Sequence, residues 1–245
     1  PDVSREDKIW VASMAAEHNL SITVIPDLYD ILLTSAIAAQ IDDLPVLSLP
    51  GMGLSASQRF IKRFLDLFVA AVLLLLSLPL SVATVIAVRM SSPGPVIYRQ
   101  ERIGYQGHRF TLYKFRTMVT NAEKHTGPVL ATAGDPRITR VGRFLRAARL
   151  DEIPQLWNVL KGEMSIVGPR PEREYFVKDY VSTIPNYKYR LIAPPGLTGM
   201  AQVHGRYNTS AEEKLKYDLY YIRNYSPWLD IQLIMQTVMT ILSKD

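Results

Sequence analysis

The sequence of 245 residues contains no cysteine, which excludes disulfide bonds and catalysis by a thiolate. Its four histidines are scattered and lack the spacing of a zinc site, so any bound metal should be a hard ion on oxygen ligands. The sequence also lacks internal repeats, low-complexity segments and a secretory signal peptide at its start, where the first residue is Pro1. From this start we expect a fragment or a processed form of a longer protein.

Apolar residues and positive charge are both plentiful. The formal net charge is +5 and 48% of the residues are hydrophobic, so a packed core is possible and anionic partners are favoured. The length allows one large domain or two small ones.

Residues 1–57 have the pattern of a piece of a separate α/β module. Ser4 can cap a helix that runs to about His18, and β-branched or apolar runs at residues 20–26 and 44–49 predict two short strands. These elements are too few for a domain of their own. The region holds no glycine-rich phosphate loop, so we assign it no cofactor.

Residues 67–88 form a run of 22 residues without a charge. As a straight helix this run would be about 33 Å long, enough to cross a bilayer core of roughly 30 Å. Two features oppose a spanning helix: Pro79 lies near the middle, and basic residues flank both ends. A helix broken at Ser77, Leu78 and Pro79 would instead enter the membrane and return to the same side. Sequence physics alone leaves these alternatives about even.

Two adjacent carboxylates, Asp151 and Glu152, precede a helical pattern that ends at Gly162. The apolar positions of that pattern share one helical face: Ile153, Leu156, Trp157 and Leu160. At a helix start, the unpaired N–H groups and the positive end of the dipole favour an ionised carboxylate and any phosphate beside it. Acids at such positions usually act only as caps. The membrane run and the basic clusters nearby favour a functional role here.

Basic residues accompany the acid pair. Arg146 precedes it and Arg170 follows it within GPRP, and guanidinium groups are well suited to phosphate oxygens. Upstream, alternating residues around a turn at residues 104–107 predict a hairpin, on which Lys114 and Arg116 point to the same face. That face would hold a substrate phosphate, lipid headgroups, or both.

Two amphipathic segments and one irregular loop complete the pattern. Residues 137–152 predict a basic amphipathic helix that leads into the acid pair. Residues 194–206 contain prolines and glycines, from which we expect no regular element and a close approach of the backbone to a ligand. Residues 228–242 predict an amphipathic helix whose apolar residues suit either the core or the bilayer interface.

The order of these motifs resembles the bacterial sugar transferase family, the monotopic phosphoglycosyl transferases that begin membrane glycan assembly. The matching segments are KRFLDLFVAAVLLLLSLPLSV, YRQERIGYQGHRFTLYKFRTM, RLDEIPQLWNVLKGEMSIVGPRP and PPGLTGMAQVHGR. The resemblance implies an α/β, membrane-embedded catalytic domain at residues 58–245. It implies a re-entrant helix-break-helix hairpin at about residues 60–90 together with amphipathic surface helices. Residues 1–57 would be the remnant of a Rossmann-like domain plus a linker.

The resemblance also implies an activity. A sugar-1-phosphate would pass from a UDP-sugar to undecaprenyl phosphate, giving a polyprenyl diphosphate sugar and UMP. Asp151 is the implied nucleophile of a covalent aspartyl intermediate, and Glu152 would assist as a metal ligand or in proton handling. Mg²⁺ would be held by Asp151, Glu152 and substrate oxygens. The implied phosphate and substrate contacts are Arg146, Arg170, Lys114, Arg116, Gln202 and Arg206.

The implied location is the cytoplasmic face of the bacterial inner membrane, in contact with membrane lipids. The pathway would be exopolysaccharide, capsule or O-antigen synthesis; a homodimer is possible, and no nucleic-acid partner is expected. Two alternatives stay open: another aspartyl-based lipid-phosphate phosphotransferase, and a non-catalytic membrane scaffold of glycan export. UMP release that depends on polyprenyl phosphate would exclude the first, and loss of function on Asp151→Asn would exclude the second. The family commonly breaks its membrane helix at a Ser-Pro pair, whereas Leu78 precedes Pro79 here.

Overall fold

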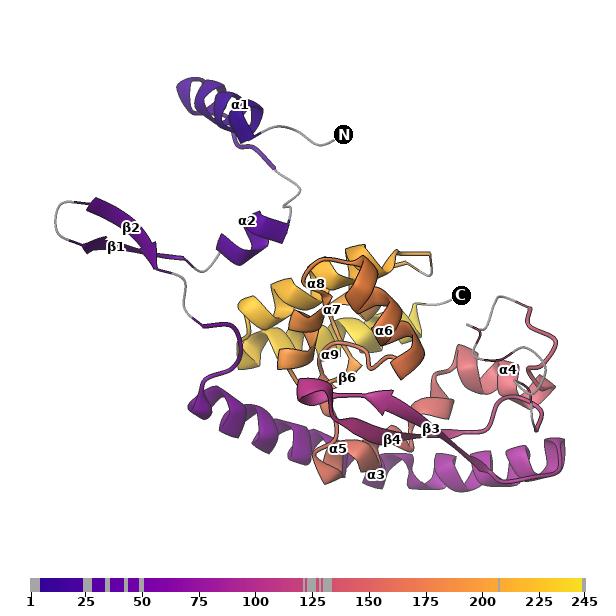
Figure 1. Cartoon of the computed structure of the whole chain (residues 1–245). Helices are drawn as coiled ribbons and strands as arrows, with labels where there is room; N and C mark the ends of the chain where they lie inside the picture. The colour runs from indigo at the N-terminus through magenta and orange to yellow at the C-terminus, as the bar shows by residue number, and fades with distance from the viewer. Residues whose placement is uncertain are drawn as a thin grey trace.

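A computed structural model describes residues 5–23, 28–33, 36–41, 44–48, 51–120, 122, 127, 129, 134–206 and 208–243. The helices are α1 (Arg5–Glu17), α2 (Leu28–Leu33), α3 (Ala56–Ser91), α4 (Arg140–Ala147), α5 (Gln155–Lys161), α6 (Glu174–Thr183), α7 (Met200–His204), α8 (Ala211–Arg223) and α9 (Pro227–Leu242). The strands are β1 (Ile37–Ile41), β2 (Leu44–Ser48), β3 (Ile97–Ile103), β4 (Arg109–Phe115), β5 (Ser165–Val167) and β6 (Gly196–Thr198). Three short 3₁₀ helices are η1 (Tyr105–Gly107), η2 (Leu150–Glu152) and η3 (Tyr187–Ile192). Figure 1 shows a mixed helix and sheet fold in which α3 runs beneath the elements that follow it.

The N-terminal region contains two helices and a small hairpin. The expected first helix is present as α1, while its expected cap Ser4 lies outside the described residues. Residues 20–23 are not in a strand, and residues 24–26 lie outside the described residues. The second expected strand is present as β2, but it pairs antiparallel with β1. A Rossmann-like sheet pairs its strands in parallel, so the described residues do not confirm that fragment.

β3 and β4 form the expected antiparallel hairpin. Ile97 lies opposite Phe115 and Ile103 lies opposite Arg109, with the tight turn η1 between the strands. Gln106 in this turn has a φ angle of 54°, in the left-handed region. The hairpin extends directly from the segment after α3, and it places Lys114 near its end, close to the acid pair described below.

β5 and β6 form a short parallel pair, in which Ser165 lies opposite Gly196. β6 and α7 both lie within residues 194–206, so the expectation that this segment holds no regular element was wrong. The two backbones approach so closely that a Cβ atom at Gly196 would lie 2.1 Å from the backbone nitrogen of Gly168. Only glycine fits this approach. The contact therefore sets the segment GPRP, which begins at Gly168, directly against β6.

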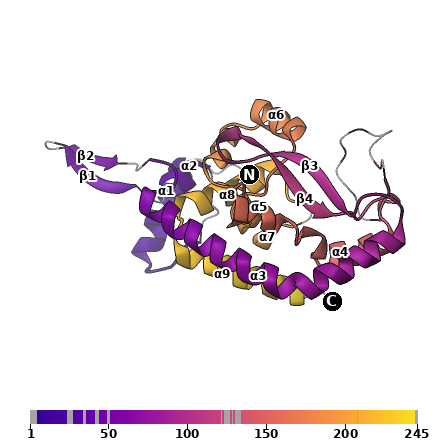
Figure 2. The same cartoon turned by 90° about the horizontal axis from the view of Figure 1, so that it is seen from below.

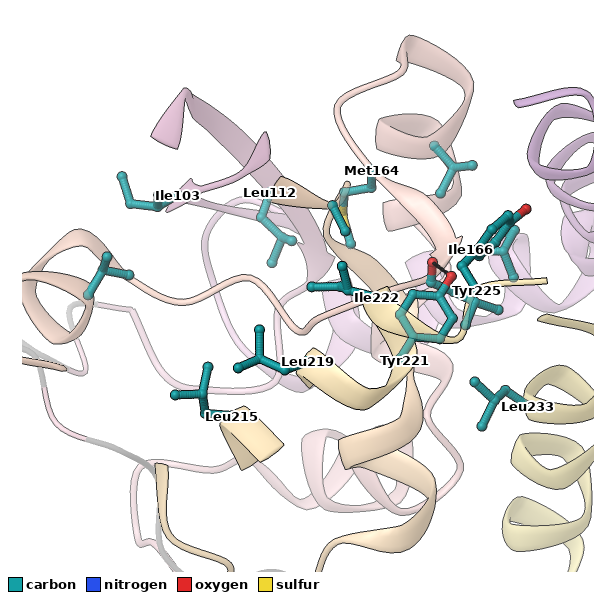
Figure 3. Packing of buried hydrophobic residues seen from close by; sticks show 14 of the residues in the cluster. Ile103, Leu112, Met164, Ile166, Leu215, Leu219, Tyr221, Ile222, Tyr225 and Leu233 are labelled. Atoms are coloured by element: carbon teal, nitrogen blue, oxygen red, sulfur yellow. Dashed lines mark hydrogen bonds between the residues drawn. The ribbon is translucent and has the colours of Figure 1, made fainter. Parts of the chain in front are cut away.

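The core of the fold lies between the hairpin, β5 and the helices α5, α8 and α9. Leu215, Leu219 and Ile222 recur at helical spacing, so one face of α8 points inward. Met164, just before β5, and Leu233, in α9, belong to the same buried cluster (Figure 3). Burial of each such side chain contributes about 1.5–3 kcal/mol. This core supports the two chain segments that carry the acid pair and GPRP.

The long apolar helix α3 is continuous, which corrects the expected break. Ser77, Leu78 and Pro79 all lie inside α3, and Figure 2 shows the helix bent in its middle rather than divided. Pro79 removes one backbone hydrogen bond, to the carbonyl four residues earlier, and this bends a helix without ending it. Ser77 Oγ donates to the Leu74 carbonyl at 3.2 Å and so supports the backbone beside the bend. The two expected arms are therefore halves of one bent helix.

The first turns of α3 attach to the fold through buried charges. Lys62 Nζ donates to Asp230 Oδ2 of α9 at 2.7 Å. Asp66 Oδ1 accepts hydrogen bonds of 2.9 Å from Ser165 Oγ and from the Ile166 N–H, both in β5. Lys62 and Asp66 are both buried. These charges flank the apolar run, yet they bind protein groups rather than water.

The far end of α3 is attached to the same fold. Arg116, just after β4, donates to the carbonyls of Ser92 at 2.6 Å and Pro93 at 3.0 Å. Arg89 Nη1 donates to the Gly94 carbonyl at 3.2 Å. Both ends of α3 are thus held by residues of the fold that follows it.

The outer side of α3 is apolar and exposed. Among the described residues, Ala56–Ser91 is one helix that is long and apolar enough to cross a membrane, judged by length and composition. α9 adds a second exposed apolar side while Leu233 and Asp230 face the protein, so this amphipathic helix contributes both to the core and to the outer surface. The exposed large apolar residues of α9 are Trp228, Ile231, Met235, Val238, Met239 and Ile241.

We expect Lys62→Ala to weaken the attachment of α3. Asp230 would remain buried without its cation, which costs about 3–5 kcal/mol for a buried pair. Arg59→Ala is the matched control, because Arg59 is exposed and makes one hydrogen bond, to the Leu54 carbonyl. Thermal unfolding in detergent should show a large loss of Tm for Lys62→Ala. The control should change the free energy of unfolding by no more than about 0.5 kcal/mol. Equal effects of the two changes would contradict this attachment.

Candidate functional site

The acid pair occupies the turn that leads into α5, as expected from the sequence. Asp151 and Glu152 lie in η2, and Ile153 and Pro154 continue in right-handed helical geometry to the first residue of α5. Arg149, just before the pair, has the left-handed angles φ 58° and ψ 15°. A side chain in this conformation costs about 1–2 kcal/mol, and such residues cluster at functional sites.

The buried face of α5 differs from the expected one. Trp157 is 54% exposed, whereas Gln155 and Asn158 are buried. The reason is polar: Asn158 Nδ2 donates to the Thr111 carbonyl at 2.7 Å and its Oδ1 accepts from the Tyr113 N–H at 3.2 Å. These bonds fasten α5 to β4, so they orient the helix by hydrogen bonding rather than by apolar spacing alone.

Two cations from different elements donate hydrogen bonds to Glu152, and Arg149 Nη1 lies 4.0 Å from its Oε2. Its Oε1 accepts from Lys114 Nζ at 2.9 Å and from Arg170 Nη2 at 2.7 Å. Although burial alone would raise the pKa of Glu152, the charges of Arg170 and Lys114 hold that pKa well below its usual range. Burial in turn lowers the pKa of Lys114, against the opposing effect of Glu152. Glu152 is therefore an ionised group that joins β4, η2 and GPRP.

Asp151 has the opposite environment. It is 7% exposed, and its carboxylate makes no hydrogen bond or ion pair with any residue that the structure describes. Burial raises the pKa of Asp151; Lys114 opposes this shift, and the negative charge of Glu152 adds to it. A carboxylate with a raised pKa is more basic than an ordinary aspartate, and no described residue engages the oxygens of Asp151.

Arg146 and Arg170 both lie close enough to lower the pKa of Asp151. Arg146 Nε donates to Thr117 Oγ1 at 2.8 Å, which holds its guanidinium in place. The Arg170 side chain is 38% exposed, so it keeps N–H groups available for an anion. The structure thus brings Lys114, Arg146 and Arg170 together around the acid pair.

Arg116 does not belong to this cluster of cations. It lies just beyond the end of β4, and its guanidinium binds the backbone after α3 as described above. Because Nη1 and Nη2 are occupied by these contacts, we assign Arg116 to the anchoring of α3 rather than to a phosphate.

Gln202 and Arg206 are not hydrogen-bonded to the acid pair. Gln202 Nε2 donates to the Leu197 carbonyl at 3.2 Å, and its buried Oε1 has no partner among the described residues. Arg206 is exposed, and its backbone N–H donates to Thr209 Oγ1 at 2.7 Å. Contact of these two residues with a nucleotide or sugar stays a prediction.

A buried ion pair that the sequence reasoning missed lies behind the site. Arg190 of η3 and Asp218 of α8 are 2.7 Å apart at their closest atoms. The signal was present in the sequence: Asp218 falls on the inward face of α8, between the core residues Leu215 and Leu219. A charge at a core position requires a buried partner.

The donor set fits Mg²⁺ in one particular way. The described residues contain no group of three or more His, Asp or Glu side chains that could hold a metal ion. Mg²⁺ is commonly held by one or two carboxylates together with substrate phosphates and water. Asp151 has unengaged oxygens, whereas Glu152 is occupied by cations. Of the two expected ligands, Asp151 fits direct coordination and Glu152 fits the holding of the neighbouring cations.

Comparison with known proteins decides the family. The model of the bacterial sugar transferase family matches residues 57–244. The chain belongs to this family. Its motif resemblance is thereby confirmed, and the acid pair, Lys114, Arg146 and Arg170 all lie within the matched range.

Curated relatives from several bacteria are similar to the chain. A UDP-N-acetylgalactosamine-undecaprenyl-phosphate N-acetylgalactosaminephosphotransferase of Aeromonas hydrophila is 46% identical over 187 residues, 75% of this chain and 44% of the relative. A UDP-glucose:undecaprenyl-phosphate glucose-1-phosphate transferase of Xanthomonas campestris pv. campestris is 40% identical over 232 residues, which are 92% of this chain and 48% of the relative. A protein of the same name from Caulobacter vibrioides is 44% identical over 191 residues, which are 75% of this chain and 70% of the relative. The chain spans about half the length of the first two relatives.

The opposite pKa shifts of the two acids predict opposite stability effects. The depressed pKa of Glu152 means that its ionised form stabilises the fold above its unfolded pKa, and Glu152→Gln should cost about 2 kcal/mol at pH 7. The raised pKa of Asp151 means that its ionised form destabilises the fold, so Asp151→Asn should raise Tm by about 2–4 °C at neutral pH.

The measurement is thermal unfolding of both variants across pH. The gain of Asp151→Asn should shrink as the pH falls through the pKa of Asp151, because the parent then becomes neutral at this position. The loss of Glu152→Gln should persist to lower pH. A lowered Tm for Asp151→Asn at neutral pH would contradict the unpartnered state of this carboxylate.

Proposed function

We propose that the chain is the catalytic part of a phosphoglycosyl transferase, which moves a sugar-1-phosphate from a UDP-sugar to undecaprenyl phosphate. One observation carries the proposal: Asp151 is buried and unpartnered beside Glu152, which two cations hold. The names of the relatives support the two substrates, since each pairs a UDP-sugar with undecaprenyl phosphate. The product would begin exopolysaccharide, capsule or O-antigen synthesis.

In the first step, a carboxylate oxygen of Asp151 attacks the phosphorus that bears the sugar. A new O–P bond forms, the bond from that phosphorus to the oxygen bridging to UMP breaks, and UMP leaves with the electron pair. Asp151 then carries the sugar phosphate as an acyl phosphate. The raised pKa of Asp151 favours this step because a more basic carboxylate donates its electron pair more readily.

In the second step, a phosphate oxygen of undecaprenyl phosphate attacks the same phosphorus. The acyl O–P bond breaks, Asp151 is released as a carboxylate, and the polyprenyl diphosphate sugar forms. The two displacements allow one site to treat two anionic substrates in sequence, so the lipid phosphate meets one covalently held phosphoryl group instead of the whole diphosphate.

The cations around the acid pair would offset the negative charge of the phosphates that these two steps bring together. Arg146 and Arg170 would steady the phosphate oxygens, and Lys114 with Arg170 keeps Glu152 ionised and fixed. Mg²⁺, held by Asp151 and substrate oxygens, would neutralise part of the diphosphate charge. Glu152 thus acts by placing Lys114 and Arg170.

We further propose a re-entrant topology for α3. Both ends of the helix are attached to the same fold, through Lys62 and Asp66 at one end and through Arg116 at the other. Opposite membrane sides would require one set of these contacts to break. The bend at Pro79 supports a helix that dips into one leaflet from the cytoplasmic face of the inner membrane and returns.

Asp151→Asn should abolish turnover, by at least about 1,000-fold, because an amide is not a nucleophile of this kind. The assay is UMP release from a panel of UDP-sugars with magnesium and undecaprenyl phosphate, and the active donor identifies the sugar. Mass spectrometry of the parent without lipid acceptor should find the sugar phosphate on Asp151. Turnover that survives in the variant would overturn the covalent mechanism.

The topology has its own test, which the absence of cysteine makes clean. Ser57→Cys and Ser91→Cys place single thiols at the two ends of α3, and Leu76→Cys places one at an exposed apolar position near the bend. With a membrane-impermeant maleimide, both end positions should label in inside-out vesicles and neither in spheroplasts. The thiol at position 76 should stay protected in both. Labelling of the two ends from opposite sides would establish a spanning helix instead.

A further inference from the structure

The ion pair of Arg190 and Asp218 is buried behind the acid pair. Its burial costs free energy of desolvation that the attraction between the two charges need not recover. Arg190 and Asp218 have side chains that are 7% and 2% exposed, and Arg190 Nε donates to Asp218 Oδ2 at 2.9 Å. Removing two charges from water costs several kcal/mol per ion, and well-packed apolar residues often serve stability equally well. Such a pair therefore invites a search for what else its members hold.

Arg190 has a contact in the direction of the site. Its Nη2 donates to the backbone carbonyl of Arg170 at 3.0 Å, while its Nη1 donates to the Tyr187 hydroxyl. Arg170 is the residue whose own guanidinium donates to Glu152 at 2.7 Å. The buried arginine thus holds the main chain of the residue whose side chain reaches the acid pair.

The segment GPRP depends on such outside donors. Arg170 stands between Pro169 and Pro171, which have no N–H groups and prevent a regular element. Four neighbouring backbone groups are held from outside the segment: the Gly168 N–H by Thr198, and the carbonyls of residues 169, 170 and 171 by Gly196, Arg190 and Arg102. Among the described residues, Arg190 alone contacts the backbone of residue 170 through a charged side chain that is almost fully buried.

We propose that Arg190, held by Asp218, is a positioning residue for the reaction: it fixes the backbone of Arg170 and so sets where the Arg170 guanidinium meets Glu152 and the phosphate. This inference rests on the proposed function for its kinetic consequence. A displacement of the Arg170 backbone by a fraction of an ångström would misplace a charge that acts in the transition state, so kcat should fall more than KM rises.

The kinetic test is a double-mutant cycle between Arg190→Lys and Arg170→Lys, read as kcat and KM for UMP release. Lysine at position 190 keeps the charge beside Asp218 but loses the planar set of donors that serves Asp218 and the Arg170 carbonyl together. We expect Arg190→Lys to lower kcat by about 10–100-fold with KM for the UDP-sugar nearly unchanged. In the Arg170→Lys background the same change should cost less than about threefold, because the side chain to be positioned is gone.

A matched control separates positioning from stability. Ser165→Ala removes another buried hydrogen bond, the one to Asp66, without contact to residue 170. It should lower Tm while kcat stays within about twofold. Losses of kcat at positions 190 and 170 that multiply, or a loss of kcat in the control that matches that of Arg190→Lys, would overturn the proposal.

A second cycle needs no activity and so distinguishes this inference from the proposed function. Thermal unfolding of Arg190→Lys, Glu152→Gln and the double variant should show Tm losses that do not add, because both changes release the same Arg170. If Arg190→Lys does not fold, Asp218→Asn replaces it in both cycles, since this change removes the charge that holds the Arg190 guanidinium and so lets its contact with the Arg170 carbonyl shift. Coupling in Tm without UMP release would leave the positioning role standing and remove the proposed reaction. Additive Tm losses would remove the positioning role whatever the activity.

Discussion

The ion pairs of Glu152 are the interaction on which the site depends. One carboxylate oxygen receives Lys114 from the hairpin and Arg170 from GPRP, so three segments far apart in the sequence meet at a single atom. Because these partners compensate the negative charge of Glu152, the neighbouring Asp151 can remain buried without a partner of its own. Two adjacent acids therefore have pKa values displaced in opposite directions, and in the proposed reaction this divergence would separate a holding role for Glu152 from a reacting role for Asp151.

The surroundings of this pair are organised to keep it rigid. Asn158 fastens α5 to β4, the contact between Gly168 and Gly196 sets GPRP against β6, and Arg190 holds the backbone of Arg170. Each of these supports is a polar or steric contact rather than an apolar one. A site that handles several phosphate charges, as the proposed function requires, would gain from such fixed dipoles and charges, because water need not reorganise around them during the reaction.

The sequence allowed part of this to be predicted and not the rest. The acid pair before α5, the hairpin and the amphipathic character of α9 follow from periodicity and turn residues, which are local signals. The inward turn of Asn158, the exposure of Trp157 and the anchoring role of Arg116 depend on partners about 24 to 47 residues away, which no local pattern contains. The continuity of α3 was missed for a different reason: a proline weakens a helix locally, but whether the helix ends or bends depends on its surroundings.

The attachment of α3 also has a consequence for biosynthesis. Lys62 and its partner Asp230 are 168 residues apart in the chain, so the helix leaves the ribosome long before its docking site exists. During that interval Lys62 and Asp66 stand one helical turn apart with opposite charges, so each can partly compensate the other. α9 then supplies Asp230, the acid that receives Lys62. The docking of α3 is therefore completed only after α9 has been synthesised.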